Sequence, residues 1–167
     1  KLEAHGMLFS SANSINWGRL LPQIVYYVYA YLELVRQRKL IFGEPMDVVV
    51  PTGNFGNILA AYYARKMGLP IRRLVCASNA NKVLTDFIRT GTYDRRREFH
   101  ATASPSMDIL ISSNLERLLY DLCGEDSETL SGWMKDLAET GVYSVGDAVR
   151  EKVQQLFYGG FCGDGST

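Results

Sequence analysis

The sequence is poor in cysteine and histidine and carries no excess charge of either sign. Its 167 residues include three cysteines, two histidines and 18 basic against 18 acidic side chains, so the formal net charge is zero. The odd number of cysteines (Cys76, Cys123 and Cys162), with no close-spaced pair, argues against a disulfide framework and against a zinc cluster. We therefore expect a reducing compartment, the cytoplasm, and no metal site.

The chain also lacks a long uninterrupted apolar run. Residues 20–35 lean most strongly toward apolar side chains, but Pro22, Gln23 and Glu33 interrupt them and four tyrosines lie among them, which makes a poor membrane span. We recognise no signal peptide. Hydrophobic residues (47%) and charged residues (22%) occur instead in the proportions of a soluble globular protein. We expect one domain over residues 1–167, no membrane partner and, because zero net charge offers little counterion release, no nucleic-acid partner.

Helical and strand patterns alternate along the chain. Apolar residues from Trp17 to Val35 recur at helical spacing, with Pro22 either in the first turn or at a kink. The β-branched run at 46–50 predicts a buried strand, and residues 57–67 and 71–77 predict a helix and a second strand parallel to the first. Further helices are predicted over residues 81–89, 115–122, 127–137 and 148–158, and a candidate strand over 107–111. The alternation predicts an α/β fold.

The loop between the first strand and its helix, residues 51–57, has the sequence Pro-Thr-Gly-Asn-Phe-Gly-Asn. Parallel sheets bind ligands at this position, because glycines let the backbone approach an anion and the free amides of the first helical turn point at it. The loop lacks the Gly-Lys-Ser/Thr of an NTPase loop and the third glycine of a dinucleotide fingerprint, so it indicates a phosphate rather than a nucleotide. A tight strand-to-helix turn would also use two glycines, and the spacing alone leaves both interpretations open.

The sequence resembles threonine synthase, a pyridoxal-phosphate enzyme of the fold type that includes the tryptophan synthase β subunit. The resemblance covers most of residues 8–120 and is carried by three strings, SANSINWGRLLPQIVYYVYAY, PTGNFGNILAAYYARKMGLPIRRLVCASNANKVLTDF and SPSMDILISSNLERLLY. It implies part of the large domain of a fold-type II enzyme, a three-layer parallel-sheet domain with flanking helices. It also implies a carbon-oxygen lyase acting on phosphates, which converts O-phospho-L-homoserine and water to L-threonine and phosphate.

The resemblance places the phosphate of the cofactor, pyridoxal phosphate, in the glycine loop. The residues implied are Gly53, Asn54, Phe55, Gly56 and Asn57. Such enzymes bind the cofactor through a lysine in a Phe-Lys-Asp-like context, and none of the six lysines, at positions 1, 39, 66, 82, 135 and 152, has that context. The family's Ser-Gly-Asp-Thr-Gly loop is missing as well. We therefore assign no catalytic residue and expect an internal fragment that is itself inactive and free of cofactor, although its parent is an enzyme.

A polar cluster precedes the first predicted helix and offers candidate substrate contacts. Its members are Asn13, Ser14, Asn16 and Arg19. The arginine could pair bidentately with the phosphate or carboxylate of the substrate. The alternative is helix capping by Ser14 or Asn13 together with a surface arginine.

Two other polar groups favour ordinary structural roles. Asn79 and Asn81 follow the second strand, where a ligand could reach them, but turn formation is the commoner role of asparagine there. Arginines 95–97 lie between acidic neighbours, as is usual for a solvated face.

A different class of function also fits these patterns. A free-standing α/β module could bind phosphate through the same loop without covalent catalysis. A large domain separated from its partner, by contrast, leaves apolar interdomain surface in water, so the fragment interpretation predicts self-association.

Overall fold

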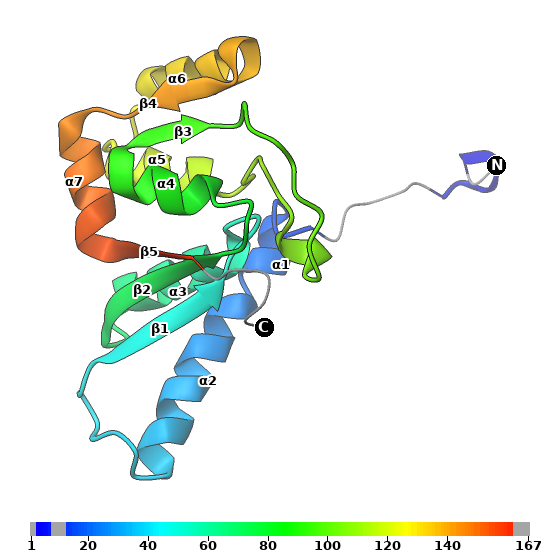
Figure 1. Cartoon of the computed structure of the whole chain (residues 1–167). Helices are drawn as coiled ribbons and strands as arrows, with labels where there is room; N and C mark the ends of the chain where they lie inside the picture. The colour runs from blue at the N-terminus through cyan, green and yellow to red at the C-terminus, as the bar shows by residue number, and fades with distance from the viewer. Residues whose placement is uncertain (1–2, 8–12, 162–167) are drawn as a thin grey trace.

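The structure is a computed structural model that describes residues 3–7 and 13–161. A parallel sheet with the strand order β1-β2-β5 lies at its centre (Figure 1). The strands are β1 (Met46–Pro51), β2 (Ile71–Ser78) and β5 (Phe157–Phe161). A separate antiparallel pair joins β3 (Thr92–Asp94) to β4 (Val142–Ser144).

Helices connect the strands and cover the sheet. They are α1 (Trp17–Leu20), α2 (Gln23–Arg36), α3 (Gly56–Lys66), α4 (Val83–Thr90), α5 (Leu115–Leu122), α6 (Ser127–Thr140) and α7 (Asp147–Leu156). Short 3-10 turns occupy Glu3–His5 and Pro105–Met107. Helix α3 is the most deeply buried, with seven of its eleven residues inside. It connects β1 to β2, and it fixes the direction in which the loop at 51–57 leaves the sheet.

The predicted β1–α3–β2 unit is confirmed. Val48 of β1 pairs with Leu74 of β2 in parallel register, as expected for strands joined through a helix. Helix α3 ends before Gly68, which has a left-handed φ of 103°. A residue without a Cβ adopts this conformation at little cost, so Gly68 ends the helix in the predicted way.

The helix predicted from Trp17 to Val35 forms over most of its length as α2, but residues 17–20 make a separate short helix, α1. Helix α1 ends at Leu20, and Pro22 is the N-cap of α2 with φ −62°. Proline has no N–H for the helical ladder and its ring blocks the preceding turn, so the break occurs there.

The end of the chain contains a strand that the periodicity did not reveal. Helix α7 stops at Leu156 instead of continuing to Tyr158, and β5 follows at once. Gly159 of this strand is needed for packing, since a Cβ there would lie 3.0 Å from the backbone of Thr85. The strand predicted at 107–111 does not form. Met107 ends the 3-10 turn Pro105–Met107, and residues 108–111 are in no strand or helix.

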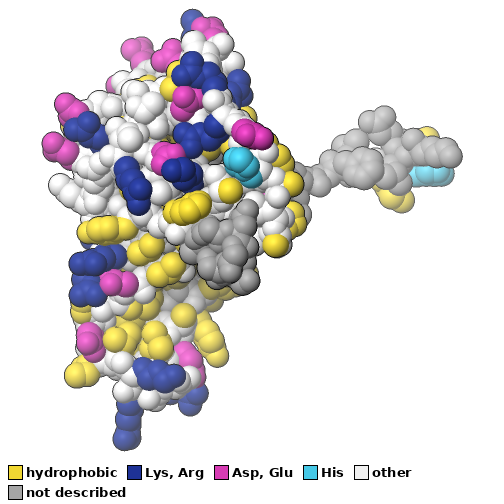
Figure 2. Space-filling model, viewed as in Figure 1, with side chains coloured by type: hydrophobic (Ala, Val, Ile, Leu, Met, Phe, Trp, Pro, Cys, Tyr) yellow, Lys and Arg dark blue, Asp and Glu magenta, His cyan; other side chains and the backbone are white. Residues whose placement is uncertain are grey.

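The two faces of the sheet differ in how far the described residues cover them. Val50, Leu74 and Phe157 lie in the core, whereas Val49 on the opposite face is 65% exposed and Tyr158 is 43% exposed. Figure 2 shows apolar side chains gathered over the part of the molecule that contains β1 and β2. The strand at 46–50 is therefore buried on one side only. The α/β class with a parallel sheet and flanking helices is confirmed, while the three-layer arrangement is incomplete within residues 3–7 and 13–161.

Candidate functional site

A cleft lies at the carboxyl end of β1, where the chain turns into α3. Its volume is about 170 Å³. The lining residues are Ser14, Gln23, Pro51, Thr52, Gly53, Asn54, Phe55, Gly56, Asn57, Ser106 and Met107. Pockets for drug-sized ligands are larger, roughly 300–1,000 Å³, so this cleft suits a small anion or one end of a larger ligand.

Most backbone amides of the loop have no acceptor within the described chain. The N–H of Thr52 donates to the Ala77 carbonyl at 2.9 Å and completes the sheet, and helical bonding resumes where Leu59 donates to the Phe55 carbonyl at 3.0 Å. Between these two points, the N–H groups of residues 53–58 make no hydrogen bond to any residue that the structure describes. The dipole of α3 places partial positive charge at the same end. The loop therefore offers what an anion needs.

The left-handed turn of this loop is made by Phe55, which has φ 64°. A side chain in this region costs about 1–3 kcal/mol and persists only where the surroundings enforce it. The ring of Phe55 is buried with its centroid 5.4 Å from that of Phe157 on β5, which supplies the enforcement.

The two glycines of the loop give the chain room for close approach. Neither has a positive φ. A Cβ on Gly56 would overlap Ser14 Oγ and lie 2.5 Å from Ser14 Cβ, and a Cβ on Gly53 would lie 2.9 Å from the carbonyl oxygen of Ser106. At these two Cβ positions the glycines therefore make room for Ser14 and Ser106 of the protein itself, and not for an anion.

Two carbonyls of the loop, those of Gly53 and Asn54, are bound by residues that do not line the cleft. Ser112 Oγ donates to the Gly53 carbonyl. The Asn54 carbonyl accepts from the backbone N–H of Asn114 at 3.1 Å and from its Nδ2 at 3.0 Å. Asparagine before a helix is usually a cap, but the fully buried side chain of Asn114 makes no capping bond to α5. Sequence reasoning missed this contact, because nothing in the local pattern shows that residue 114 reaches residue 54.

Asn57 and Gln23 complete the rim of the cleft. The Tyr27 hydroxyl donates to the side-chain oxygen of Asn57 and to its backbone carbonyl, the latter at 3.1 Å. Burial raises the pKa of Tyr27 to about 12, so the hydroxyl stays protonated and able to donate at neutral pH. Gln23 Oε1 is buried and has no hydrogen-bond partner among the described residues. A buried polar atom of this kind calls for a ligand, a water or a half-turn of the amide group.

The structure brings one of the four predicted substrate residues into the cleft. Ser14 lines it, whereas Arg19 is exposed and is not among the lining residues. Asn16 caps α1 by accepting from the N–H of Gly18 at 2.9 Å, and Asn13 Oδ1 accepts from the N–H of Ile15 at 3.2 Å. Capping thus occurs in the cluster, but at Asn16 instead of Ser14 or Asn13. The substrate assignment stays a prediction.

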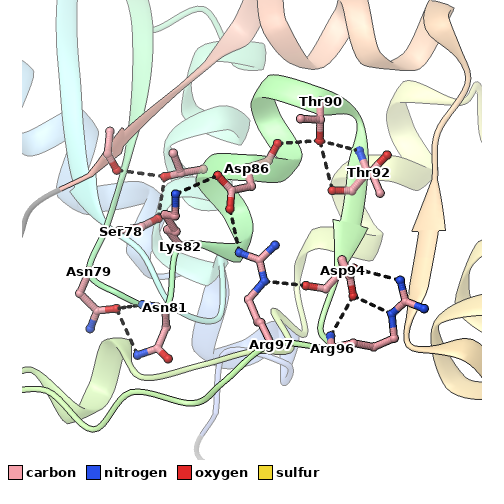
Figure 3. Close-up of polar contacts among 12 residues, drawn as sticks. Ser78, Asn79, Asn81, Lys82, Asp86, Thr90, Thr92, Asp94, Arg96 and Arg97 are labelled. Carbon is pink, nitrogen blue, oxygen red and sulfur yellow. Dashed lines mark hydrogen bonds and ion pairs between the residues drawn. The ribbon is translucent and has the colours of Figure 1, made fainter.

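Asn79 and Asn81 lie side by side after β2 and support the cleft indirectly (Figure 3). Both donate to Asp108, from Asn79 Nδ2 at 2.7 Å and from Asn81 Nδ2 at 3.1 Å. Asp108 also accepts from the backbone N–H of Thr102 at 2.8 Å. These contacts hold the segment that brings Ser106 to the cleft wall, which is a structural role.

The run of arginines at 95–97 is engaged with carboxylates and carbonyls of its own chain. Arg96 binds Asp94 through Nε and Nη2, both at 3.0 Å, and Arg97 Nη1 lies 2.7 Å from Asp86 Oδ2 (Figure 3). Hydrogen bonds from Arg96 lower the pKa of Asp94 to about 2. These pairs agree with the solvated face that the sequence predicted.

No described lysine lines the cleft. Lys66, in the last turn of α3, binds Asp121 at 2.7 Å, and Lys82 lies 3.7 Å from Asp86. Within residues 3–7 and 13–161, no three metal-ligating side chains are grouped to hold an ion. In the same part of the chain, no helix combines the length and the apolar character needed to cross a membrane.

The chain is similar to several known proteins, although no model of a protein family matches it. Threonine synthase-like 1 of Homo sapiens is 54% identical over 162 residues, which are 96% of this chain and 22% of that protein. Threonine synthase of Schizosaccharomyces pombe is 41% identical over 88% of this chain and 32% of its own length. A crystal structure of threonine synthase from Brucella melitensis with bound PLP matches 92% of this chain and 32% of its own, with a TM-score of 0.85 at 40% identity.

The chain therefore spans less than a third of the length of each of these three relatives. Sequence and fold agree over this span, since proteins named threonine synthase or threonine synthase-like are similar to the chain in sequence and a threonine synthase is similar to it in structure. The resemblance expected from the sequence is confirmed: nearly the whole chain corresponds, in sequence and in fold, to a segment of threonine synthases.

Proposed function

We propose that this chain is the phosphate-binding part of a longer pyridoxal-phosphate-dependent lyase of the threonine synthase type. The proposed substrate of the whole protein is O-phospho-L-homoserine, which water converts to L-threonine and phosphate. The observation that carries the proposal is that the N–H groups of residues 53–58 have no acceptor in the described chain, while residues 53–57 line a cleft at the N-terminus of α3.

The residues present fit the phosphate end of the cofactor. A phosphate group accepts several hydrogen bonds, and the loop has donors to spare. Gln23 Oε1 has no partner among the described residues, and a half-turn of its side-chain amide would present two further donors to the cleft. Gly53, Asn54, Phe55, Gly56 and Asn57 would hold the phosphate, with Tyr27 fixing Asn57 from α2. Pyridoxal phosphate, when bound, acts as an electron sink for carbanion chemistry.

The chain's own contribution in this proposal is binding and orientation. Backbone donors held by a rigid strand and helix fix the phosphate without reorganising, so the reactive end of the ligand is held in one place. Ser14, which lies against Gly56, adds a hydroxyl to the lining of the cleft. The covalent lysine is not assigned to any residue here, because the described lysines lie away from the cleft.

We further propose that this chain is a fragment of a longer cytoplasmic protein and is inactive by itself. The short span relative to the threonine synthases supports the fragment interpretation. A phosphate-binding module without covalent chemistry is the second candidate, and the same free amides favour it.

The test is a titration of the isotopically labelled chain with inorganic phosphate, followed by borohydride reduction in the presence of pyridoxal phosphate. We expect the amide signals of residues 53–58 to shift with phosphate, and peptide mapping to find no single lysine labelled stoichiometrically. Absence of any shift in these signals would refute anion binding at the loop. Stoichiometric labelling of one lysine, together with formation of threonine, would show a complete enzyme and refute the fragment interpretation.

A further inference from the structure

A buried asparagine and a neighbouring arginine connect the glycine loop with the segment at 13–16, from which Ser14 lines the cleft. Asn114 is completely buried and uses its side chain in three directions. Its Nδ2 donates to the Asn54 carbonyl at 3.0 Å and to Ser14 Oγ at 2.9 Å, and its Oδ1 accepts from Arg117 Nη1 at 2.6 Å. The two donors of this side-chain amide therefore bind the loop and Ser14, and its acceptor binds Arg117.

Arg117 extends the connection to the backbone of the segment at 13–16. Its guanidinium donates to the carbonyl of Ser14 at 3.1 Å and to the carbonyl of Ile15. It also lies 5.8 Å from the ring centroid of Trp17, the first residue of α1. A planar fork with several donors can satisfy this set of acceptors at once, which a lysine cannot do.

These contacts determine where the loop amides point. In a trans peptide the C=O of one residue and the N–H of the next point in opposite directions. Ser112 holds the Gly53 carbonyl and Asn114 holds the Asn54 carbonyl, so the N–H groups of Asn54 and Phe55 are turned away from the segment at 112–114. Asn54 and Phe55 line the cleft, whereas Ser112 and Asn114 do not, so these two amides are free to serve a ligand in the cleft.

We propose that Asn114 and Arg117 are positioning residues that aim the loop amides at the anion and make the segment at 13–16 move together with the loop. This inference rests on the proposed function in so far as it concerns the anion. It also explains why residue 56 is a glycine. Asn114 binds Ser14 Oγ and holds Ser14 so close to Gly56 that a Cβ there would overlap it.

The first variant is Asn114→Asp, which keeps the size and the acceptor for Arg117 but places an oxygen against the Asn54 carbonyl. The second is Arg117→Lys, which keeps the charge and loses the fork. Thr85→Val is the matched control, because Thr85 is fully buried and loses two hydrogen bonds, to Ser78 Oγ and to the Gly160 carbonyl, away from the cleft.

The measurements use the 167-residue chain and two readouts. Without ligand, 15N relaxation order parameters report the amides of residues 13–16 and 53–58. With inorganic phosphate, the shifts of residues 53–58 report the Kd. We expect Asn114→Asp to weaken phosphate binding at least tenfold and Arg117→Lys to weaken it about threefold, with order parameters falling in both segments. Thr85→Val should lower the stability and leave both readouts unchanged.

The outcomes separate this inference from the proposed function. If wild type binds no phosphate, the proposed function fails, and the ligand-free order parameters still decide whether the two segments depend on Asn114 and Arg117. If neither variant changes the order parameters of both segments beyond the Thr85→Val control, the positioning role is refuted. If Asn114→Asp does not fold, Arg117→Lys alone decides by the same criterion.

Discussion

Replacing Gly56 by alanine should disconnect the loop from the segment that packs against it. The new Cβ would lie 2.5 Å from Ser14 Cβ, whereas ordinary contacts lie at 3.4–4 Å, so one of the two segments must move by about 1 Å. The movement costs about 1–3 kcal/mol, the usual range for an overpacked site. Because Ser14 Oγ is bound by Asn114, which also holds the Asn54 carbonyl, the displacement reaches the amides at 53–58.

We therefore expect Gly56→Ala to weaken the binding of inorganic phosphate by about tenfold, which corresponds to a loss of roughly 1.4 kcal/mol. The assay is titration monitored by the amide signals of residues 53–58. Gly132→Ala is the matched control, because Gly132 lies in α6, where an added Cβ would meet no atom of another described segment within 4 Å. This control should keep the phosphate affinity and gain up to about 1 kcal/mol of stability, since alanine is the better helix former.

A double substitution tests the stated cause. Gly56→Ala combined with Ser14→Gly removes the two Ser14 atoms nearest to the new Cβ and should recover part of the affinity lost in the single variant, although it also removes the hydroxyl that Asn114 binds. Equal phosphate affinity of wild type and Gly56→Ala, within a factor of two, would show that the close approach of Ser14 is irrelevant to binding. Failure of the double variant to recover would show that the loss has another origin.

Three further changes test other parts of the structure. Phe55→Gly should be less destabilising than Phe55→Ala by about 1 kcal/mol in urea unfolding, because both lose the ring but only glycine adopts the left-handed φ freely, and the opposite order would contradict an enforced turn. The pKa of Asp94 is lowered to about 2 in the folded chain, so the stabilisation from its ionised carboxylate is present above about pH 4 and is lost as the pH falls toward 2. Asp94→Asn should therefore make the free energy of unfolding less dependent on pH between these values. An unchanged acid unfolding transition would refute this. Val49→Lys on the exposed face of the edge strand should reduce self-association of the chain in sedimentation experiments, whereas a monomeric wild type that binds no hydrophobic dye would contradict an exposed interdomain surface.

The sequence predicts the local elements well where one period dominates. Helix α3 and strands β1 and β2 are such cases, because a β-branched run, a glycine loop and a helical pattern follow one another. Strand β5 could not be predicted in this way, since the aromatic and glycine residues at 157–161 take their role from Leu74 and Thr85, far away in sequence. A disturbance at Pro22 is visible in the sequence, but whether it kinks one helix or separates two depends on packing.

The pattern of two glycines between strand and helix points to the same loop whose amides lack acceptors in the described chain, and anion binding there stays a prediction. It gave no indication that Phe55 makes the left-handed turn or that Asn114 holds the loop, because both depend on contacts with Phe157 and with residues 54 and 14. Tertiary contacts of this kind leave no periodic trace in a single sequence.

The pairing of β5 with β2 has a consequence for how the chain acquires its fold. Leu74 pairs with Phe157, more than eighty residues later, so the central strand gains its second neighbour only after residues 157–161 are available. Closing a loop of this length costs entropy before the pairing returns any stabilisation, which slows folding. Since the Phe157 ring also packs against Phe55, the strained turn at the cleft acquires its support in that same late step. A polypeptide still emerging from the ribosome would accordingly hold β1, α3 and β2 before it could hold a finished anion loop.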